Sequence, residues 1–155
     1  MSVKFRAVSL SHLRAPVEIR ELIYLQKDTC KSLLGKLKDL LGVKEAMVFS
    51  TCNRTEVYYT SEEDLSQDII KSVCVEKGIL ETNRFFQYFD VYEEAEAVPY
   101  LFEVSMGLHS SVLGDLQISS QVKQAYSWRM SWIWPELSCT GSCTPFSILI
   151  SVYSR

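Results

Sequence analysis

The segment STCNRTEVYY, residues 50–59, brings together the residue types that thiolate chemistry needs. One cysteine, Cys52, lies between the hydroxyl residue Thr51 and the cation Arg54. A free thiol titrates near about 8.5, and a nearby positive charge favours the thiolate, which is the form that attacks carbonyl carbon. If residues 52–54 are extended, the two side chains leave the same face with their bases roughly 7 Å apart, a gap that the long arginine stem can close around a substrate carboxylate.

The same residues also fit an ordinary structural role. Free cysteine is usually a small buried hydrophobe, so Cys52 can be a packing residue flanked by a turn residue, Asn53, and a solvated Arg54. Spacing alone leaves both interpretations open.

Two short segments position Cys52. Residues 46–49 are apolar and residues 55–60 are β-branched and aromatic, and both patterns are typical of strands. We therefore expect Cys52 at a strand end or in a tight connection, where a rigid scaffold aims an accessible side chain.

The remaining sequence alternates extended and helical patterns. Leucines recur at helical spacing over residues 33–41 and Gly42 follows them as a terminator. Pro99 is tolerated only near the start of a helix, so its helix should begin late or bend. Strands are predicted at residues 3–10, 45–50, 54–60 and 86–89, and helices at 16–25, 33–41, 66–77, 93–107 and 115–126. This order predicts an α+β fold with a small, mainly antiparallel sheet covered by helices.

Length and composition limit the class of protein. A chain of 155 residues is one ordinary domain that buries roughly 70% of its unfolded surface. Its five cysteines are too sparse and irregular for a secreted disulfide framework, and the first ten residues hold no apolar signal segment. No apolar run approaches the ~20 residues that cross a bilayer. We expect a soluble, cytoplasmic protein with no membrane association.

The net charge of −3 is unevenly distributed. Residues 1–54 carry ten lysines and arginines against five acids, whereas residues 55–155 carry six against fourteen. A polyanion would be drawn to the amino-terminal half, near Cys52, although the balance falls short of a strongly basic nucleic-acid-binding domain. A solvated surface accounts for the same difference.

Three segments resemble glutamyl-tRNA reductase, the enzyme that opens the five-carbon route to tetrapyrroles. STCNRTEVY, residues 50–58, looks like the family's nucleophile motif; SLSHLRAPVEIRE, residues 9–21, is similar to its amino-terminal signature; and GLHSSVLGDLQISSQVKQAY, residues 107–126, resembles its second long signature. The motifs occur in the family's order and spacing, and the resemblance extends over residues 3–126. It implies the same α+β architecture.

The resemblance implies NADPH-dependent reduction of glutamyl-tRNA to glutamate-1-semialdehyde, on the route to 5-aminolevulinate. The thiolate of Cys52 would attack the glutamyl ester, displace tRNA and leave a thioester, which accepts a hydride more readily than an oxygen ester does. By the same match, the glutamate contacts are Thr51, Asn53, Arg54, Ser110, Asp115, Leu116, Gln117 and Gln121. For the two glutamines, four residues apart, the alternative is one exposed helix face.

Two departures from the family pattern affect this expectation. Tyr100 stands where most members have a histidine thought to assist catalysis, and a phenol that titrates near about 10 can donate a hydrogen bond but is a poor base. No glycine-rich GxGxxG fingerprint occurs in the sequence. The family carries its NADPH domain and its dimerising helices farther along the chain, so we expect no cofactor-binding residues here and a homodimer only through those helices.

Residues 127–155 differ from the rest in composition. They hold all three tryptophans, a single acid and no lysine. Codons back-translated for this segment and read one base out of frame can spell a peptide that resembles the family's continuation. We therefore expect a catalytic domain at residues 1–126, followed by a non-family tail whose frame has shifted near Ser127. Cys139 and Cys143 have no histidine partners, so we predict no metal site.

Other classes of function remain open. The domain can be a non-catalytic module that binds tRNA or a regulator through the same pocket, or a purely structural α+β protein if the three motifs coincide by chance. A glutamyl adduct on Cys52 after incubation with glutamyl-tRNA separates the enzyme from the binding module.

Overall fold

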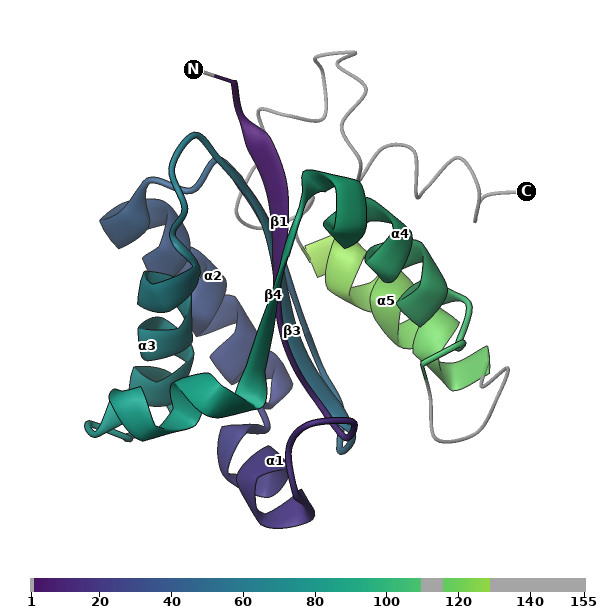
Figure 1. Ribbon diagram of the computed structural model, residues 1–155, viewed down its shortest axis with the longest axis horizontal. Coiled ribbons are helices and arrows are strands. Elements are labelled where there is room, and N and C mark those ends of the chain that lie inside the picture. The colour runs from purple at the N-terminus through teal and green to yellow at the C-terminus, as the bar shows by residue number, and fades with distance from the viewer. Residues whose placement is uncertain (1, 110–115, 129–155) are drawn as a thin grey trace.

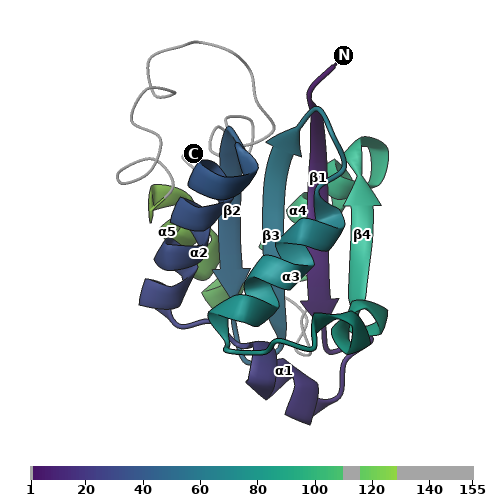
Figure 2. The same cartoon turned by 90° about the vertical axis from the view of Figure 1, so that its left-hand side faces the viewer.

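The computed structural model describes residues 2–109 and 116–128. Within them, four strands form one sheet in the order β2-β3-β1-β4, and every neighbouring pair is antiparallel. Figure 2 shows this sheet behind α2 and α3. The strands are β1 (Lys4–Ser11), β2 (Glu45–Ser50), β3 (Arg54–Ser61) and β4 (Phe89–Glu93).

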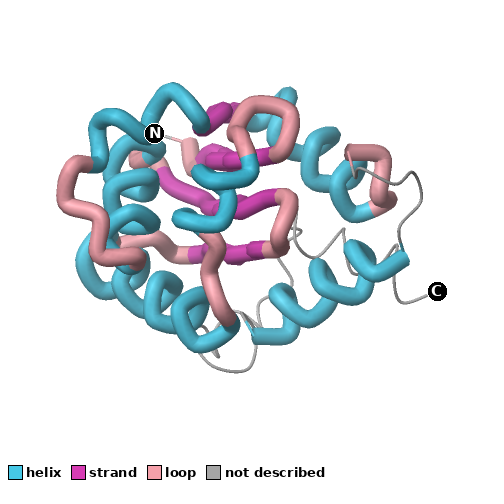
Figure 3. The backbone as a smooth tube through the Cα atoms, turned by 90° about the horizontal axis from the view of Figure 1, so that it is seen from below, coloured by secondary structure: helices cyan, strands magenta, loops and turns pink. Residues whose placement is uncertain are grey.

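Helices cover both faces of the sheet. In Figure 1, α2 and α3 lie on one face and α4 and α5 on the other, and Figure 3 shows the same layers from below. α1 lies beyond one end of the sheet. The helices are α1 (Val17–Ile23), α2 (Lys27–Leu41), α3 (Ser66–Glu76), α4 (Glu94–Ser105) and α5 (Leu116–Trp128), with a 3-10 helix, η1, at Thr82–Tyr88.

Two hydrophobic clusters hold these layers together. Because side chains alternate between the faces of a strand, the central strand β1 contributes Val8 and Leu10 to the cluster under α2 and α3. It contributes Phe5 and Ala7 to the cluster under α4 and α5. The sheet is therefore buried on both faces, and a polar side chain on the α4 face of a central strand is enclosed by protein.

The predicted α+β fold is confirmed. The sheet is antiparallel and helices cover it, as the pattern of elements indicated. The terminator predicted at Gly42 is also confirmed, because α2 ends at Leu41 and Gly42 caps it with a φ of 64°. Glycine takes this left-handed conformation readily, since it has no Cβ.

The structure departs from the prediction at two places. The strand predicted at residues 86–89 is wrong, because Thr82–Tyr88 forms a 3-10 helix and β4 begins only at Phe89. The helical turn places Phe85 in the core with 1% of its surface exposed. The helix predicted at residues 93–107 is present as α4, but the late start considered for it because of Pro99 is wrong, since α4 begins at Glu94. The proline ring leaves the carbonyl oxygen of Ala95, four residues earlier, without a helical N–H donor. Ala95 and Pro99 are both exposed, so water can donate to this oxygen instead.

Some predicted features lie outside the described residues. These are the contacts at Ser110 and Asp115 and residues 129–155, which include Cys139 and Cys143. The domain boundary and the shifted frame of the tail therefore stay predictions. In the part of the chain that the structure describes, no helix combines the length and the apolar composition that a bilayer span needs.

Candidate active site

Cys52 lies in the tight turn that joins β2 to β3. The backbone N–H of Thr51 donates to the carbonyl oxygen of Arg54 at 2.8 Å, and the N–H of Asn53 donates to Oγ1 of Thr51 at 3.2 Å. These bonds bend residues 51–54, so the extended geometry that would put Cys52 and Arg54 on one face is absent from the turn. The side chain of Cys52 is exposed.

Exposure distinguishes Cys52 from the other cysteines of the described residues. Cys30 in α2 and Cys74 in α3 are buried in the core. Burial raises the pKa of Cys30 to about 12 and the pKa of Cys74 to about 11. A thiol that stays protonated at neutral pH is a poor nucleophile. Of the three, Cys52 is the one that an external electrophile can reach.

Residues of the β1–α1 connection and of α1 brace the turn. The backbone N–H of His12 donates to the carbonyl oxygen of Asn53 at 2.9 Å, and Nη1 of Arg20 donates to Oδ1 of Asn53 at 3.1 Å. Burial, followed by the positive charges of Arg54 and Arg20, lowers the pKa of His12, so its ring is neutral at neutral pH. The amino-terminal motif and the cysteine motif therefore meet in space.

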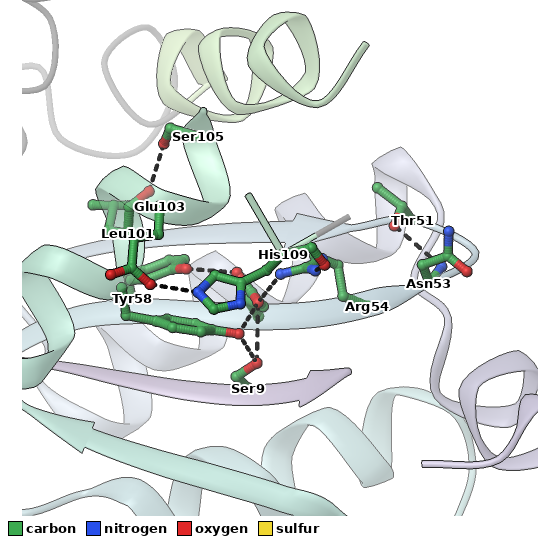
Figure 4. Close-up of polar contacts among 11 residues, drawn as sticks. Ser9, Thr51, Asn53, Arg54, Tyr58, Leu101, Glu103, Ser105 and His109 are labelled. Atoms are coloured by element: carbon green, nitrogen blue, oxygen red, sulfur yellow. Dashed lines mark hydrogen bonds and ion pairs between the residues drawn. The ribbon is translucent and has the colours of Figure 1, made fainter. Parts of the chain in front are cut away.

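Arg54 points away from solvent, into the layer between the sheet and α4 (Figure 4). Its side chain is 1% exposed. Nη1 donates to Oε1 of Glu56 at 3.0 Å, and Nη2 donates to the carbonyl oxygen of His109. The alternative prediction of a solvated Arg54 is therefore wrong. The turn separates an exposed thiol from a buried guanidinium.

Four polar side chains surround the buried carboxylate of Glu56. Together with Glu56 we call them the Glu56 cluster: Ser9, Arg54, Glu56, Tyr58 and Tyr100. Oε1 of Glu56 accepts hydrogen bonds from Oγ of Ser9 at 3.0 Å, from Nη1 of Arg54 at 3.0 Å and from the hydroxyl of Tyr100 at 2.8 Å. Oε2 accepts from the hydroxyl of Tyr58 at 2.5 Å. The side chain of Glu56 is 0% exposed. A carboxylate is tolerated at such a place because a cation and three hydroxyls satisfy it.

Tyr100 reaches the Glu56 cluster from α4. Its ring stacks on Tyr92 with the centroids 4.2 Å apart, and it tilts against the ring of His109 at 5.2 Å. Burial, followed by the negative charge of Glu56, raises the pKa of the Tyr100 phenol. At neutral pH the hydroxyl therefore donates to Glu56 and is not available as a base.

His109 lies after α4, inside the third motif. Its Nε2 pairs with Oε2 of Glu103, and its carbonyl oxygen accepts from Arg54. One guanidinium thus ties residues 107–109 to the cysteine motif. All three motifs that the sequence singled out converge on the β2–β3 turn and the cluster beneath it.

The comparisons with known proteins cover the stretch of chain that holds the three motifs. Residues 8–132 match the family described as Glutamyl-tRNAGlu reductase, N-terminal domain. The chain belongs to this family. It is 50% identical over 129 residues to the glutamyl-tRNA reductase of Cytophaga hutchinsonii, covering 83% of this chain and 30% of that protein. It is 44% identical over 123 residues to that of Desulforudis audaxviator, covering 78% of this chain and 27% of that protein.

A solved structure has the same fold. The glutamyl-tRNA reductase from Methanopyrus kandleri superposes with a TM-score of 0.71 at 24% identity, covering 97% of this chain and 33% of that chain. This likeness concerns the fold. The chain spans about 30% of the length of the glutamyl-tRNA reductases that it matches in sequence.

The glutamate contacts expected from the glutamyl-tRNA reductase motifs fall into two groups. Thr51, Asn53 and Arg54 lie in the β2–β3 turn and at the start of β3, and three of the others lie in α5. Leu116 is the first residue of α5. Gln117 and Gln121 are exposed on that helix, and Gln121 lines a solvent-open hollow of about 200 Å³ whose walls include Leu25 and Ser50. Because Ser50 ends β2, the hollow reaches the strand that leads to the turn.

Sequence reasoning missed three members of the Glu56 cluster, which are Ser9, Glu56 and Tyr58. One signal was available within the glutamyl-tRNA reductase motif itself. Arg54, Glu56 and Tyr58 alternate along β3, so they share one face of the strand. Polar groups on one face of a strand rich in β-branched and aromatic residues indicate an enclosed network. The partners of Glu56 on the other elements, Ser9 on β1 and Tyr100 on α4, are not indicated by any comparable sequence pattern.

Proposed function

We propose that Cys52 accepts the glutamyl group of glutamyl-tRNA as a thioester, which is the step before reduction to glutamate-1-semialdehyde in tetrapyrrole biosynthesis. The observation that supports this most directly is an exposed Cys52 in a turn braced by the other two motifs of the family. We take the substrate from the relatives, which are named glutamyl-tRNA reductase. A rigid turn with a protruding thiol is a suitable place for acyl transfer.

The proposed step is a transesterification to sulfur. Sγ of Cys52, after losing its proton, forms a bond to the carbonyl carbon of the glutamyl ester. The bond from that carbon to the ribose oxygen of tRNA breaks, and the ribose oxygen takes up the proton that the thiol lost. No electron leaves the system, so the acylation itself needs no cofactor.

Recognition of glutamate is proposed for Thr51, Asn53 and Arg54 in the turn, together with the contacts in and before α5. A guanidinium binds a carboxylate in a bidentate manner. For Arg54 the proposal requires that the substrate carboxylate reach a side chain that is 1% exposed. Substitution of Arg54 therefore tests recognition separately from the thiol chemistry of Cys52.

The described residues do not fit NADPH. The sequence contains no GxGxxG fingerprint, and the described sheet is antiparallel throughout, unlike the parallel βαβ unit that binds dinucleotides. Nor do the described residues group three His, Cys, Asp or Glu side chains as a metal site would. We therefore propose the acyl-accepting step for this chain and derive no hydride transfer from its residues.

The test is acylation of the full 155-residue chain by glutamyl-tRNA, followed by peptide mapping with mass spectrometry. We expect a glutamyl adduct on Cys52 that disappears in Cys52→Ser. Cys74→Ala is the matched control, because Cys74 is buried in α3 and should leave the adduct in place. Binding of tRNA without any adduct would refute the enzyme proposal and support a binding module.

A further inference from the structure

Glu56 is fully enclosed and is held from three different elements. Ser9 donates from β1, Tyr58 from β3 itself and Tyr100 from α4. Each of these bonds is between 2.5 and 3.0 Å long. The carboxylate therefore cannot change rotamer without breaking contacts to two strands and a helix. Among the described residues it is also paired with the guanidinium of Arg54, at 3.0 Å.

We infer that Glu56 is a positioning residue: its immobilised carboxylate sets the guanidinium of Arg54 so that it recognises the side-chain carboxylate of the glutamyl substrate. This inference rests on the proposed function, and it adds a residue that touches no reacting atom. An arginine stem has many rotamers, and holding it in advance removes the entropy cost of ordering it when substrate binds.

The charges within the cluster support this role. Glu56 neutralises Arg54 in the absence of substrate, so a buried cation is not left unpaired. The guanidinium has five N–H donors, more than its contacts with Glu56 and His109 use. Burial, followed by the charge of Glu56, raises the pKa of Tyr58 and of Tyr100. Both phenols therefore stay protonated at neutral pH and keep donating to the carboxylate.

A purely structural role for Glu56 makes a different prediction. If the carboxylate only fastens α4 to the sheet, its loss disturbs the whole site and slows every acyl donor alike. If it acts through Arg54, its loss weakens donors that carry a side-chain carboxylate and spares those that do not. Selectivity between two donors of the same shape separates the two roles.

The experiment compares two activated thioesters, one of glutamate and one of its neutral isostere glutamine, as acyl donors to Cys52. In Glu56→Gln we expect kcat/KM for the glutamyl donor to fall about 10- to 100-fold, mainly through KM, because charge-assisted contacts of Arg54 are lost or misplaced. The value for the glutaminyl donor should stay within about 2-fold of the original protein. Circular dichroism verifies that the variant is folded.

Glu45→Gln is the matched control. Glu45 is also a buried glutamate of this sheet, at 6% exposure, but it begins β2 at the opposite end from the turn. Its substitution should leave the ratio of the two donors unchanged. If Glu56→Gln does not fold, Glu56→Asp keeps the charge but withdraws it by one methylene, and it should lose selectivity in the same direction.

Two outcomes would overturn the inference. One is an equal loss for both donors in the folded Glu56 variant, which would indicate a structural role. The other is full retention of selectivity in Glu56→Gln, or in Glu56→Asp where it replaces that variant. Failure of the proposed function looks different, since the unmodified chain would then form no adduct on Cys52 with either donor.

Discussion

Replacing Tyr100 by phenylalanine removes one hydroxyl from the Glu56 cluster and keeps the ring. The hydroxyl donates to Oε1 of Glu56 at 2.8 Å and lies 2.9 Å from Oγ of Ser9. The side chain is 7% exposed, and its ring stacks on Tyr92. Because the stacked ring remains, Tyr100→Phe deletes a buried hydrogen bond without opening a ring-sized cavity.

The size of the effect follows from the charge of the acceptor. A hydrogen bond to an ionised group contributes about 1.5–3 kcal/mol, and the other donors of Glu56 remain in the variant. We expect the free energy of unfolding of Tyr100→Phe to fall by about 2 kcal/mol. For a chain of this size that loss lowers Tm by about 4–8 °C.

Urea unfolding followed by far-ultraviolet circular dichroism measures this change. Tyr24→Phe is the control, because Tyr24 is 38% exposed and its substitution should change the free energy of unfolding by less than about 0.5 kcal/mol. If Tyr100→Phe loses no more free energy of unfolding than Tyr24→Phe does, the phenol does not help to hold Glu56. That result would refute the stabilising role that we assign to the Glu56 cluster.

The same variant tests whether Tyr100 replaces the family histidine as a base. Burial and the charge of Glu56 raise the pKa of Tyr100, so the phenol stays protonated between about pH 6 and about pH 9. The rate of Cys52 acylation should therefore keep the shape of its pH profile in Tyr100→Phe. Loss of an ascending limb in that range would show that the phenol does act as a base.

Four further outcomes can be measured on the same chain. Iodoacetamide should alkylate Cys52 in the native state well before Cys30, whose burial raises its pKa to about 12, and peptide mapping that finds equal rates would refute this. Gly42→Ala should lower the free energy of unfolding by about 1–2 kcal/mol, because residue 42 has a φ of 64° that alanine adopts only with strain. Gly35→Ala should raise the free energy of unfolding by about 0.5–1 kcal/mol, because Gly35 lies inside α2 with open space around the added Cβ. Burial raises the pKa of Tyr59 from 10.0 to about 12. The protonated phenol therefore contributes fully to the free energy of unfolding below pH 10, and this contribution is lost as the pH rises toward 12. Tyr59→Phe should flatten that decline in urea titrations. NADPH added to the acylated chain should release no aldehyde, and an aldehyde trapped with a hydrazine would contradict our proposal that the described residues do not fit NADPH.

Much of the fold could be predicted because local signals agree with the tertiary structure. β2 occupies residues 45–50 as predicted, since an apolar run there is followed directly by turn residues. α2 ends where Gly42 supplies a left-handed cap. The error at residues 86–89 has a different cause. Aromatic residues suit strands and core-facing helical turns equally, and packing of Phe85 against α3 and its neighbours decides in favour of the 3-10 helix.

The candidate site could be predicted only in part. Residues 51–54 stand out by type and spacing, but their conformation depends on bonds from His12 and Arg20, which lie far away in sequence. The burial of Arg54 likewise depends on α4, which closes over that face of the sheet. A sequence pattern does not specify which helix covers a strand, so the partner of Glu56 on α4 was not predictable.

The period of two along β3 explains why one motif holds both an exposed thiol and a buried guanidinium. Residues 51–53 precede the strand and are shaped by the turn, so their side chains include an exposed thiol. From Arg54 onward the alternation of the strand applies, and Arg54 and Glu56 must face the same covered side of the sheet. Moving the strand boundary by one residue would send both charges to the opposite face, among the leucines of α2. The adjacency of thiol and guanidinium in sequence therefore gives two different environments: Cys52 is exposed, where we propose acyl transfer, and Arg54 is buried, where we propose recognition of the substrate carboxylate.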